Sequence, residues 1–253
     1  MSWASRRQLI YLFIAIFLIV VIGMAGFLFF KPKATCFDGK KNQNEENVDC
    51  GGICTACLGE TKDIIVLWSN VFSLGNGKYE VASLFKNPNL FAGLPELKYR
   101  FKIYDTNNIL IAIREGQTFM NPNEEYLIFE TDISGGERIP KRVFIEFDNL
   151  NWRRIEKERP QIFILEKNFN DAIFPMLEAK VSNKSLVSLN NIEAAAILFD
   201  AEDNAIGVSI TKIDSLPPES SGSISFTWPG KFNEIPASSK ILIRNNLTNA
   251  GGI

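Results

Sequence analysis

Four cysteines are the residues whose type and spacing most clearly suggest chemistry. They are confined to a segment with the spacing C-x13-C-x3-C-x2-C. A cluster this tight has a local explanation, either two disulfides or one metal ion. A structural zinc site usually presents two CxxC-type pairs, and only the last two cysteines form one. Because the polar stretch between the first two cannot build a core, we predict two disulfides. Their pairing is open among three connectivities of Cys36, Cys50, Cys54 and Cys57.

The stretch between the first two cysteines also carries oxygen ligands of the kind that calcium prefers. These are Asp38, Asn42, Glu45 and Asp49. Side chains of these types equally form turns by bonding nearby backbone groups. We favour the turn-forming role, so the sequence predicts no metal and keeps calcium as the alternative.

Other constellations that would support catalysis are missing or misplaced. The chain has no histidine, which removes Ser-His and Cys-His pairs and every histidine-containing metal site. Ser83 and Lys86 have the S-x-x-K spacing of some acyl-enzymes, which place the two residues on a helix. Here they lie in a strand-like sequence, where they would point to opposite faces. We therefore expect a protein that is not an enzyme and has no cofactor.

Charge and exposed apolar residues bear on the partners. The 27 basic and 29 acidic side chains give a net charge of −2, which argues against a nucleic-acid binder. Basic residues between 138 and 159 suggest an acidic surface polymer as partner, although interspersed glutamates favour a mixed solvated surface. Leu90, Phe91 and Leu94 lie in a loop-like stretch and are a candidate contact for an envelope protein.

Residues 9–30 form an apolar run without a charged side chain. As a helix this run would extend about 33 Å, enough to cross a bilayer core of about 30 Å. Arg6 and Arg7 precede it, and Lys31 and Lys33 follow it. A cleaved signal peptide is the alternative, but the run is longer than the usual signal-peptide core. We predict an uncleaved single-pass anchor in the lipid bilayer.

From residue 61 onward, short apolar and alternating runs are separated by turn residues, which predicts many β-strands. The segment FKIYD at 101–105 has a counterpart, AILFD, at 196–200, a shift of 95 residues. The same shift, to within one residue, relates other landmarks, so we predict two modules, each the size of a seven-stranded sandwich. The aromatic residues expected in their cores are Trp68, Tyr79, Tyr104, Phe163, Phe174 and Phe199.

Two resemblances accompany these patterns. The cysteine segment resembles a short C-x-D-G-x-x-N-x-x-E-x-x-x-D-C-G-G-x-C-x-x-C module of bacterial and archaeal surface proteins, with every fixed position filled. FKIYD is close to the signature of the FxLYD-type modules, which are immunoglobulin-like sandwiches related to late-embryogenesis-abundant domains. AILFD departs from that signature at its first residue. The resemblance implies tethered, extracytoplasmic β-sandwiches with no common enzymatic activity.

The sequence therefore predicts a mainly β protein with one transmembrane helix, a small cysteine-rich module and two tandem immunoglobulin-like β-sandwiches. The expected parts are an N-terminal tail at 1–8, the helix at 9–30, the cysteine-rich stalk at 31–60, sandwiches at 61–155 and 156–248, and a C-terminal tail at 249–253.

Its expected function is that of a membrane-anchored binding or structural protein of the cell envelope. The N-terminus is expected in the cytoplasm and the C-terminal domains outside it. The disulfides, rather than the flanking charges, set this orientation. The alternative is a cytoplasm-facing, membrane-tethered regulatory protein whose cysteines hold zinc.

Overall fold

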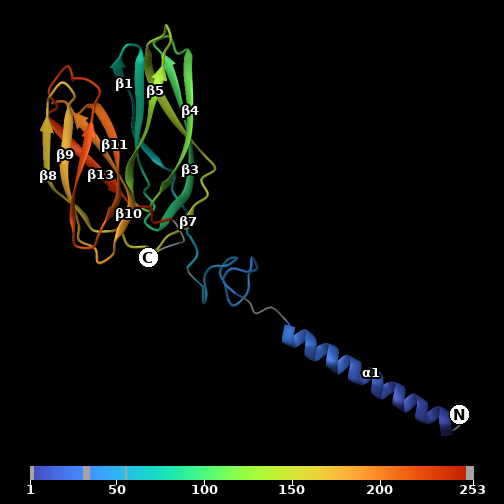
Figure 1. Cartoon of the computed structure of the whole chain (residues 1–253). Helices are drawn as coiled ribbons and strands as arrows, with labels where there is room; N and C mark the ends of the chain where they lie inside the picture. The colour runs from blue at the N-terminus through green and yellow to red at the C-terminus, as the bar shows by residue number, and fades with distance from the viewer. Residues whose placement is uncertain (1–2, 31–34, 55, 249–253) are drawn as a thin grey trace. The chain divides into compact units, whose positions relative to one another are not determined.

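The computed structural model describes residues 3–30, 35–54 and 56–248. It divides into two compact units, Met1–Cys57 and Leu58–Ile253. The boundary lies three residues before the predicted end of the stalk at residue 60. All described strands belong to the second unit (Figure 1). The predicted C-terminal tail at 249–253 and the flanking Lys31 and Lys33 lie outside the described residues.

The first unit begins with α1, Trp3–Phe30. The helix therefore begins inside the predicted tail at 1–8, at Trp3, rather than at residue 9. Residues 3–8 continue the helix because they contain good helix formers and neither glycine nor proline. The Arg7 guanidinium lies 4.0 Å from the centre of the Trp3 ring, one turn away. The stretch Arg6–Met24 is long and apolar enough to cross a membrane, and none of it is buried against other parts of the chain.

The second unit consists of antiparallel strands in two sandwiches. In the first, β1-β2-β5 faces β4-β3-β6, and the short β7 pairs with β3. Its strands are β1 Ile65–Gly75, β2 Lys78–Lys86, β3 Ala92–Asp105, β4 Leu110–Met120, β5 Glu125–Ser134, β6 Pro140–Asp148 and β7 Arg153–Arg154.

In the second sandwich, β8-β9-β12 faces β11-β10-β13. Its strands are β8 Ile162–Asn170, β9 Met176–Asn183, β10 Leu189–Phe199, β11 Ala205–Leu216, β12 Ser221–Thr227 and β13 Ser238–Arg244. The pairing order is the same in both halves: first-second-fifth strand against fourth-third-sixth. Each half is thus an immunoglobulin-like sandwich built on six of these strands rather than seven. The module boundary predicted at 155/156 falls between β7 and β8 and stays a prediction.

Two kinds of turn recur at the same place in both halves. Asp105 ends β3 and Asp200 follows β10, and each carboxylate accepts hydrogen bonds from the backbone N–H groups two and four residues later. Asn87 directly follows β2, Asn183 ends β9, and both side chains are fully buried. The side-chain amide of each donates to backbone carbonyls of two later segments. Side chains of the same type therefore fix the same loops in both sandwiches.

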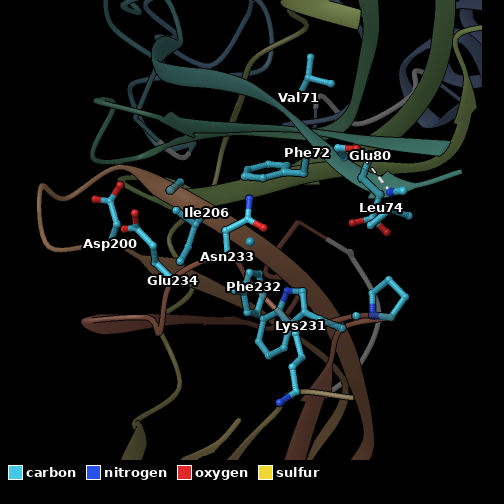
Figure 2. A pocket seen from close by; sticks show the side chains of 17 residues that line it. Val71, Phe72, Leu74, Glu80, Asp200, Ile206, Lys231, Phe232, Asn233 and Glu234 are labelled. Atoms are coloured by element: carbon cyan, nitrogen blue, oxygen red, sulfur yellow. Dashed lines mark hydrogen bonds between the residues drawn. The ribbon is translucent and has the colours of Figure 1, made fainter. Parts of the chain in front are cut away.

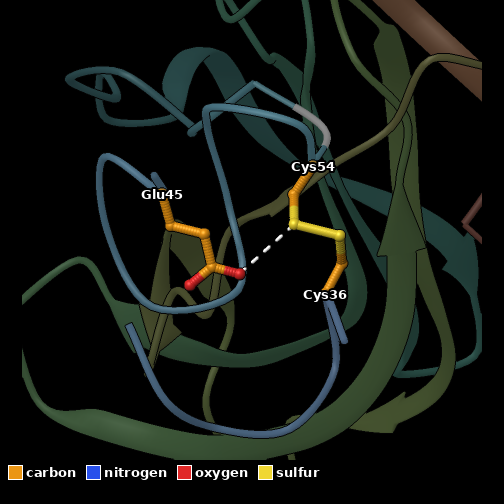
Figure 3. A group of neighbouring side chains, drawn as sticks. All are labelled: Cys36, Glu45 and Cys54. Carbon is orange, nitrogen blue, oxygen red and sulfur yellow. Dashed lines mark hydrogen bonds between the residues drawn. A yellow bond between two sulfur atoms is a disulfide. The ribbon is translucent and has the colours of Figure 1, made fainter. Parts of the chain in front are cut away.

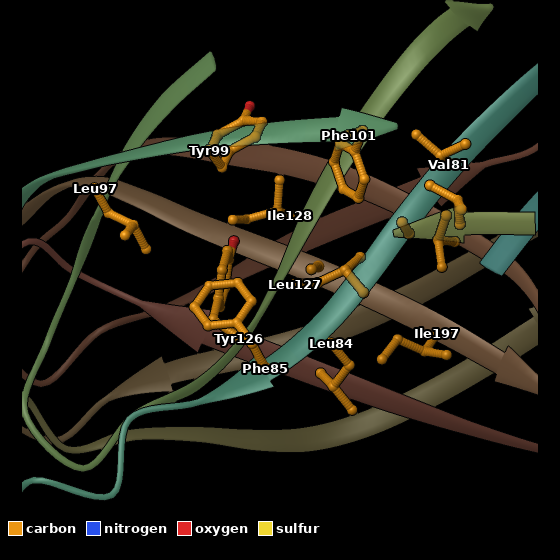
Figure 4. Packing of buried hydrophobic residues seen from close by; sticks show 14 of the residues in the cluster. Val81, Leu84, Phe85, Leu97, Tyr99, Phe101, Tyr126, Leu127, Ile128 and Ile197 are labelled. Atoms are coloured by element: carbon orange, nitrogen blue, oxygen red, sulfur yellow. The ribbon is translucent and has the colours of Figure 1, made fainter. Parts of the chain in front are cut away.

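The two sandwiches share a continuous core. Residues 81–85 of β2 are all buried, which means that this strand is covered on both faces. The cluster that contains Phe85 and Leu84 also contains Ala195 and Ile197 of β10, from the other half (Figure 4). Successive residues of a strand point to opposite faces. Residues Ala194, Ala196 and Leu198 of β10 therefore pack into the core of the second sandwich.

Several predicted core positions require correction. Phe163 is 52% exposed and Phe174 is 67% exposed, so neither is a core residue. Phe163 lies in β8, at a sheet edge, and Phe174 lies in the bend that follows this strand. Tyr104 is half-buried and contacts the ring of Phe144. Residues of β3 alternate between its two faces, and the core face carries Phe101 and Ile103 instead. The other three predicted positions, Trp68, Tyr79 and Phe199, are partly buried against the shared core.

Candidate functional site

The four cysteines form two disulfides, Cys36–Cys54 and Cys50–Cys57. No free cysteine is left. The predicted disulfides are therefore present, with a pairing that the spacing alone did not decide. The alternative of a four-cysteine zinc site is wrong for this structure, because zinc binds thiolates and a disulfide offers none.

Acidic side chains organise the backbone around these disulfides. The Asp49 carboxylate accepts hydrogen bonds from the backbone N–H groups of Asp38 and Gly39. The Asp38 carboxylate accepts from the Asn42 side chain and from the Lys40 N–H. The bond from Asn42 is the main cause that holds the pKa of Asp38 below its usual value. The side chains considered for calcium thus bond local groups, as turn-forming residues do.

Glu45 is the buried member of this group. One oxygen, Oε2, accepts hydrogen bonds from the N–H groups of Asn42 and Asp49. The other, Oε1, lies 3.2 Å from Cys54 Sγ (Figure 3). A disulfide sulfur carries no proton, so this last contact is not a conventional hydrogen bond. Glu45 and its two neighbouring sulfurs lie close enough together to surround an ion, but sulfurs joined in a disulfide are not thiolate ligands. Glu45 therefore stabilises the loop through its hydrogen bonds to the backbone of Asn42 and Asp49.

A cleft lies between the two sandwiches and is a candidate binding site. Its volume is about 720 Å³, and it lies between the β1–β2 hairpin, the β10–β11 turn and the loop 228–234 (Figure 2). Apolar side chains line part of it, and polar side chains the rest. The apolar ones include Phe72, Ile206 and Phe232, and the polar ones include Glu80, Asp200 and Lys231. The sequence did not predict this site, because its residues come from segments far apart in the chain.

Glu80 is the carboxylate of the cleft whose environment is most unusual. It lies in β2 and is half-buried. Burial raises the pKa of Glu80 from 4.5 to about 7. Asp200, on the other side of the cleft, behaves differently. Its pKa is lowered, chiefly by the hydrogen bond from the Asn204 side chain. At neutral pH the cleft therefore contains one carboxyl group poised between its charged and neutral forms.

Trp228 is a buried member of the cleft wall. Its side chain is packed edge-on against the rings of Phe169 and Phe232. Its indole Nε1 is buried and has no hydrogen-bond partner among the described residues. A Cβ at Gly207 would approach this nitrogen to 3.0 Å and Phe232 to 2.6 Å, so the glycine provides the space beside the indole. Because this nitrogen is buried, Trp228 serves as an apolar wall, and Glu80 is the group of unusual pKa that the cleft offers to a ligand.

Of the three residues predicted to contact a partner, Leu90, Phe91 and Leu94, two are exposed and one is buried. Leu90 and Phe91 are exposed, and Arg154 lies over the Phe91 ring at 5.2 Å. Leu94 is fully buried in the shared core, so its assignment to a contact surface is wrong. The loop NPNLFAGLP gives way to β3 at Ala92, and this strand carries Leu94 inward. A partner contact at Leu90 and Phe91 stays a prediction.

Three of the basic residues between 138 and 159 are engaged with neighbouring groups. Arg138 forms an ion pair with Asp105 at 2.7 Å, and Arg154 forms one with Glu156 at 2.7 Å. Arg159 donates to the Pro122 carbonyl. These contacts agree with a mixed surface more closely than with an open cationic patch.

Arg244 joins the two sandwiches. Its side chain is 4% exposed and lies 2.7 Å from the Glu193 carboxylate. Although it belongs to β13, it donates to the Phe119 carbonyl and the Thr118 hydroxyl of the first sandwich. Its guanidinium also lies 3.6 Å from the centre of the Tyr126 ring. The sequence offered no signal for this role, because the partners of Arg244 in the first sandwich lie more than 100 residues away in the chain.

Comparisons with known proteins do not name a family. No protein-family model matches the chain, and no curated protein matches it significantly. One similar solved structure is a transglutaminase of red sea bream, which is 10% identical. The match covers 73% of this chain and 29% of the transglutaminase, with a TM-score of 0.26. A likeness this weak supports no statement about activity.

Proposed function

We propose that this protein is a single-pass, membrane-anchored binding or structural protein of the cell envelope, with its β-sandwiches outside the cytoplasm. The observation that carries the proposal is the pair of disulfides in the segment between an exposed apolar helix and the β-unit. Disulfides persist in oxidising compartments, so the module after the helix belongs on the extracytoplasmic side. The N-terminus then lies in the cytoplasm.

This proposal is tested by the mass and the accessibility of the protein in membranes. An uncleaved anchor gives a mature mass of 28.5 kDa in the alkali-resistant membrane fraction. Protease added to intact, wall-stripped cells should degrade the β-unit, and thiol labelling of denatured, unreduced protein should modify no cysteine. Cleavage close to residue 25 would identify α1 as a signal peptide. Four reactive thiols together with a protected β-unit would place the protein in the cytoplasm.

The cleft supports a binding role over a purely structural one. The half-buried carboxyl group of Glu80 and the apolar side chains that line the cleft beside it are groups that a ligand could contact. The proposed ligand is an envelope protein or surface polymer. Hydrogen exchange of the full chain in lipid nanodiscs, with and without isolated envelope material, tests this role. Protection of residues 71–75 and 228–234 supports it. Unchanged exchange there, with protection around Leu90 and Phe91, would move the site to that surface.

We also propose that the two sandwiches are FxLYD-type repeats of one module. The support is the common pairing order and the paired asparagine and aspartate turns described above. An experimental structure in which Asn87 and Asn183 do not superpose after alignment of the sandwiches would contradict this proposal.

A further inference from the structure

Two of the most exposed apolar side chains outside α1 belong to the cysteine module. Phe37 is 92% exposed and Ile53 is 71% exposed. Phe37 directly follows Cys36, and Ile53 directly precedes Cys54. The Cα atoms of these two cysteines are 5.6 Å apart, since a disulfide joins them. With about 3.8 Å between consecutive Cα atoms, the Cα atoms of Phe37 and Ile53 lie within about 13 Å of each other. The disulfide therefore holds these two exposed apolar residues within one small region of the module, which we call the Phe37–Ile53 patch.

The chain between α1 and this patch is short. Helix α1 ends at Phe30, and Cys36 is six residues further on. An extended chain spans at most about 3.6 Å per residue, so Cys36 lies within about 22 Å of the end of the helix. A bilayer adds a headgroup layer of roughly 5 to 8 Å on each side of its hydrocarbon core. If α1 is anchored as proposed above, the module is confined close to the membrane surface.

We propose that the Phe37–Ile53 patch docks on the lipid–water interface of the bilayer that holds α1. This inference rests on the proposed membrane anchoring and adds a second lipid contact to it. Phenylalanine and branched aliphatic side chains are of the kind that enter the boundary between headgroups and acyl chains. Lys40 and Lys41 follow within the same loop and are exposed, so their ammonium groups can stay among the headgroups.

Physical considerations favour lipid as the occupant over another protein. The patch consists of two side chains, far less than the area of about 800 Å² per partner in a standard protein interface. An interfacial contact has no such threshold, because the tether keeps the patch at a high local concentration near the membrane. Burying even about 60 Å² of apolar surface would shift the docking equilibrium about tenfold.

Site-specific photocrosslinking of the full chain tests this proposal. Benzoylphenylalanine replaces one residue at a time in protein reconstituted into nanodiscs, and lipid adducts are counted by mass spectrometry. Phe37 and Ile53 are the test positions. Phe17 in α1 is the positive control for anchoring, and Leu186, 84% exposed in the β-unit, is the control for exposure alone. We expect lipid adducts at Phe37 and Ile53 to be at least about tenfold more frequent than at Leu186.

The outcomes separate docking from anchoring. Adducts at Phe17 without adducts at Phe37 and Ile53 would overturn docking and leave the anchor intact. No lipid adduct at Phe17 would instead refute the proposed membrane anchor. Crosslinks from Phe37 to the β-unit or to a second copy of the chain, in place of lipid, would likewise overturn the proposal. As a second measurement, Phe37→Asp combined with Ile53→Asp should lower adduct formation from a probe at Lys40 severalfold, while the tether still keeps the module near the membrane. Unchanged adduct formation there would count against docking.

Discussion

The carboxyl group of Glu80 gives a prediction whose size and sign both follow from its burial. In the folded protein its pKa is raised from 4.5 to about 7 by desolvation. Each unit of pKa difference corresponds to about 1.4 kcal/mol, which sets a ceiling of roughly 3 kcal/mol. Glu80 is only half-buried and water reaches it, so we expect about 1 to 2 kcal/mol.

The direction follows from proton binding. Between pH 4.5 and 7 the folded state retains a proton that the unfolded state has lost. The stability that Glu80 contributes is therefore fully present below pH 4.5, and it is lost as the pH rises through about 7. Glutamine is close in shape to glutamate and cannot ionise. We predict that Glu80→Gln is about 1 to 2 kcal/mol more stable than the parent at pH 8, and nearly equal to it at about pH 4, below the unfolded-state pKa.

Thermal unfolding of the full chain in detergent micelles, followed at both pH values, measures this effect. For a unit of this size the gain at pH 8 corresponds to a rise in melting temperature of about 3 to 6 °C. Glu137→Gln is the matched control, because Glu137 lies exposed in the β5–β6 turn, and its melting temperature should follow that of the parent. A Glu80→Gln variant that is no more stable than the parent at pH 8, or that gains equally at both pH values, would refute the reasoning.

Three further predictions concern buried polar groups and the disulfides. Asn183→Ala should destabilise the β-unit by roughly 2 to 4 kcal/mol in urea unfolding, because several buried carbonyls lose their donor. Asn87→Ala should destabilise the β-unit by a similar amount, and a loss of stability below about 0.5 kcal/mol in either variant would contradict the prediction for that residue. Arg244→Met should cost about 3 to 5 kcal/mol in the same assay, with partial recovery in the double variant that adds Glu193→Gln, since the partly buried carboxylate that Arg244 no longer neutralises is then uncharged. Lack of recovery would argue against charge as the cause. Reduction of both disulfides should leave the melting temperature of the β-unit unchanged, because all four cysteines lie in the first unit, and calorimetry that shows a lower value would contradict the separation of the units.

Much of the fold follows from local patterns. The apolar run from residue 9 predicts α1, and the alternating runs after residue 61 predict strands, because both depend on side chains close together in the sequence. Disulfides were also predictable, from the density of cysteines in a polar segment. The pairing of the cysteines was not predictable, because it depends on the conformation of loops such as Gly51–Gly52, where both residues have positive φ angles.

Positions that depend on distant parts of the chain were harder to predict. Phe163 and Leu94 are both apolar residues flanked by strand-like sequence, yet one is exposed on an edge strand and the other is in the core. Which strand lies at an edge is decided by pairing with remote segments, not by local composition. The cleft and the Arg244 contacts were missed for the same reason, because no short motif links residues contributed by separate sandwiches.

The core shared by the two sandwiches has a consequence for biosynthesis. Because a chain is synthesised from its N-terminus, β1 to β6 are complete before β10 is available. Until then, the face of β2 that packs on Ile197 in the finished protein is open to water. The first sandwich is thus an incomplete intermediate with an exposed apolar surface. Its protection from aggregation depends on rapid folding of the second sandwich or on a chaperone. For the same reason, a fragment that ends near residue 155 should aggregate, whereas the whole β-unit should not.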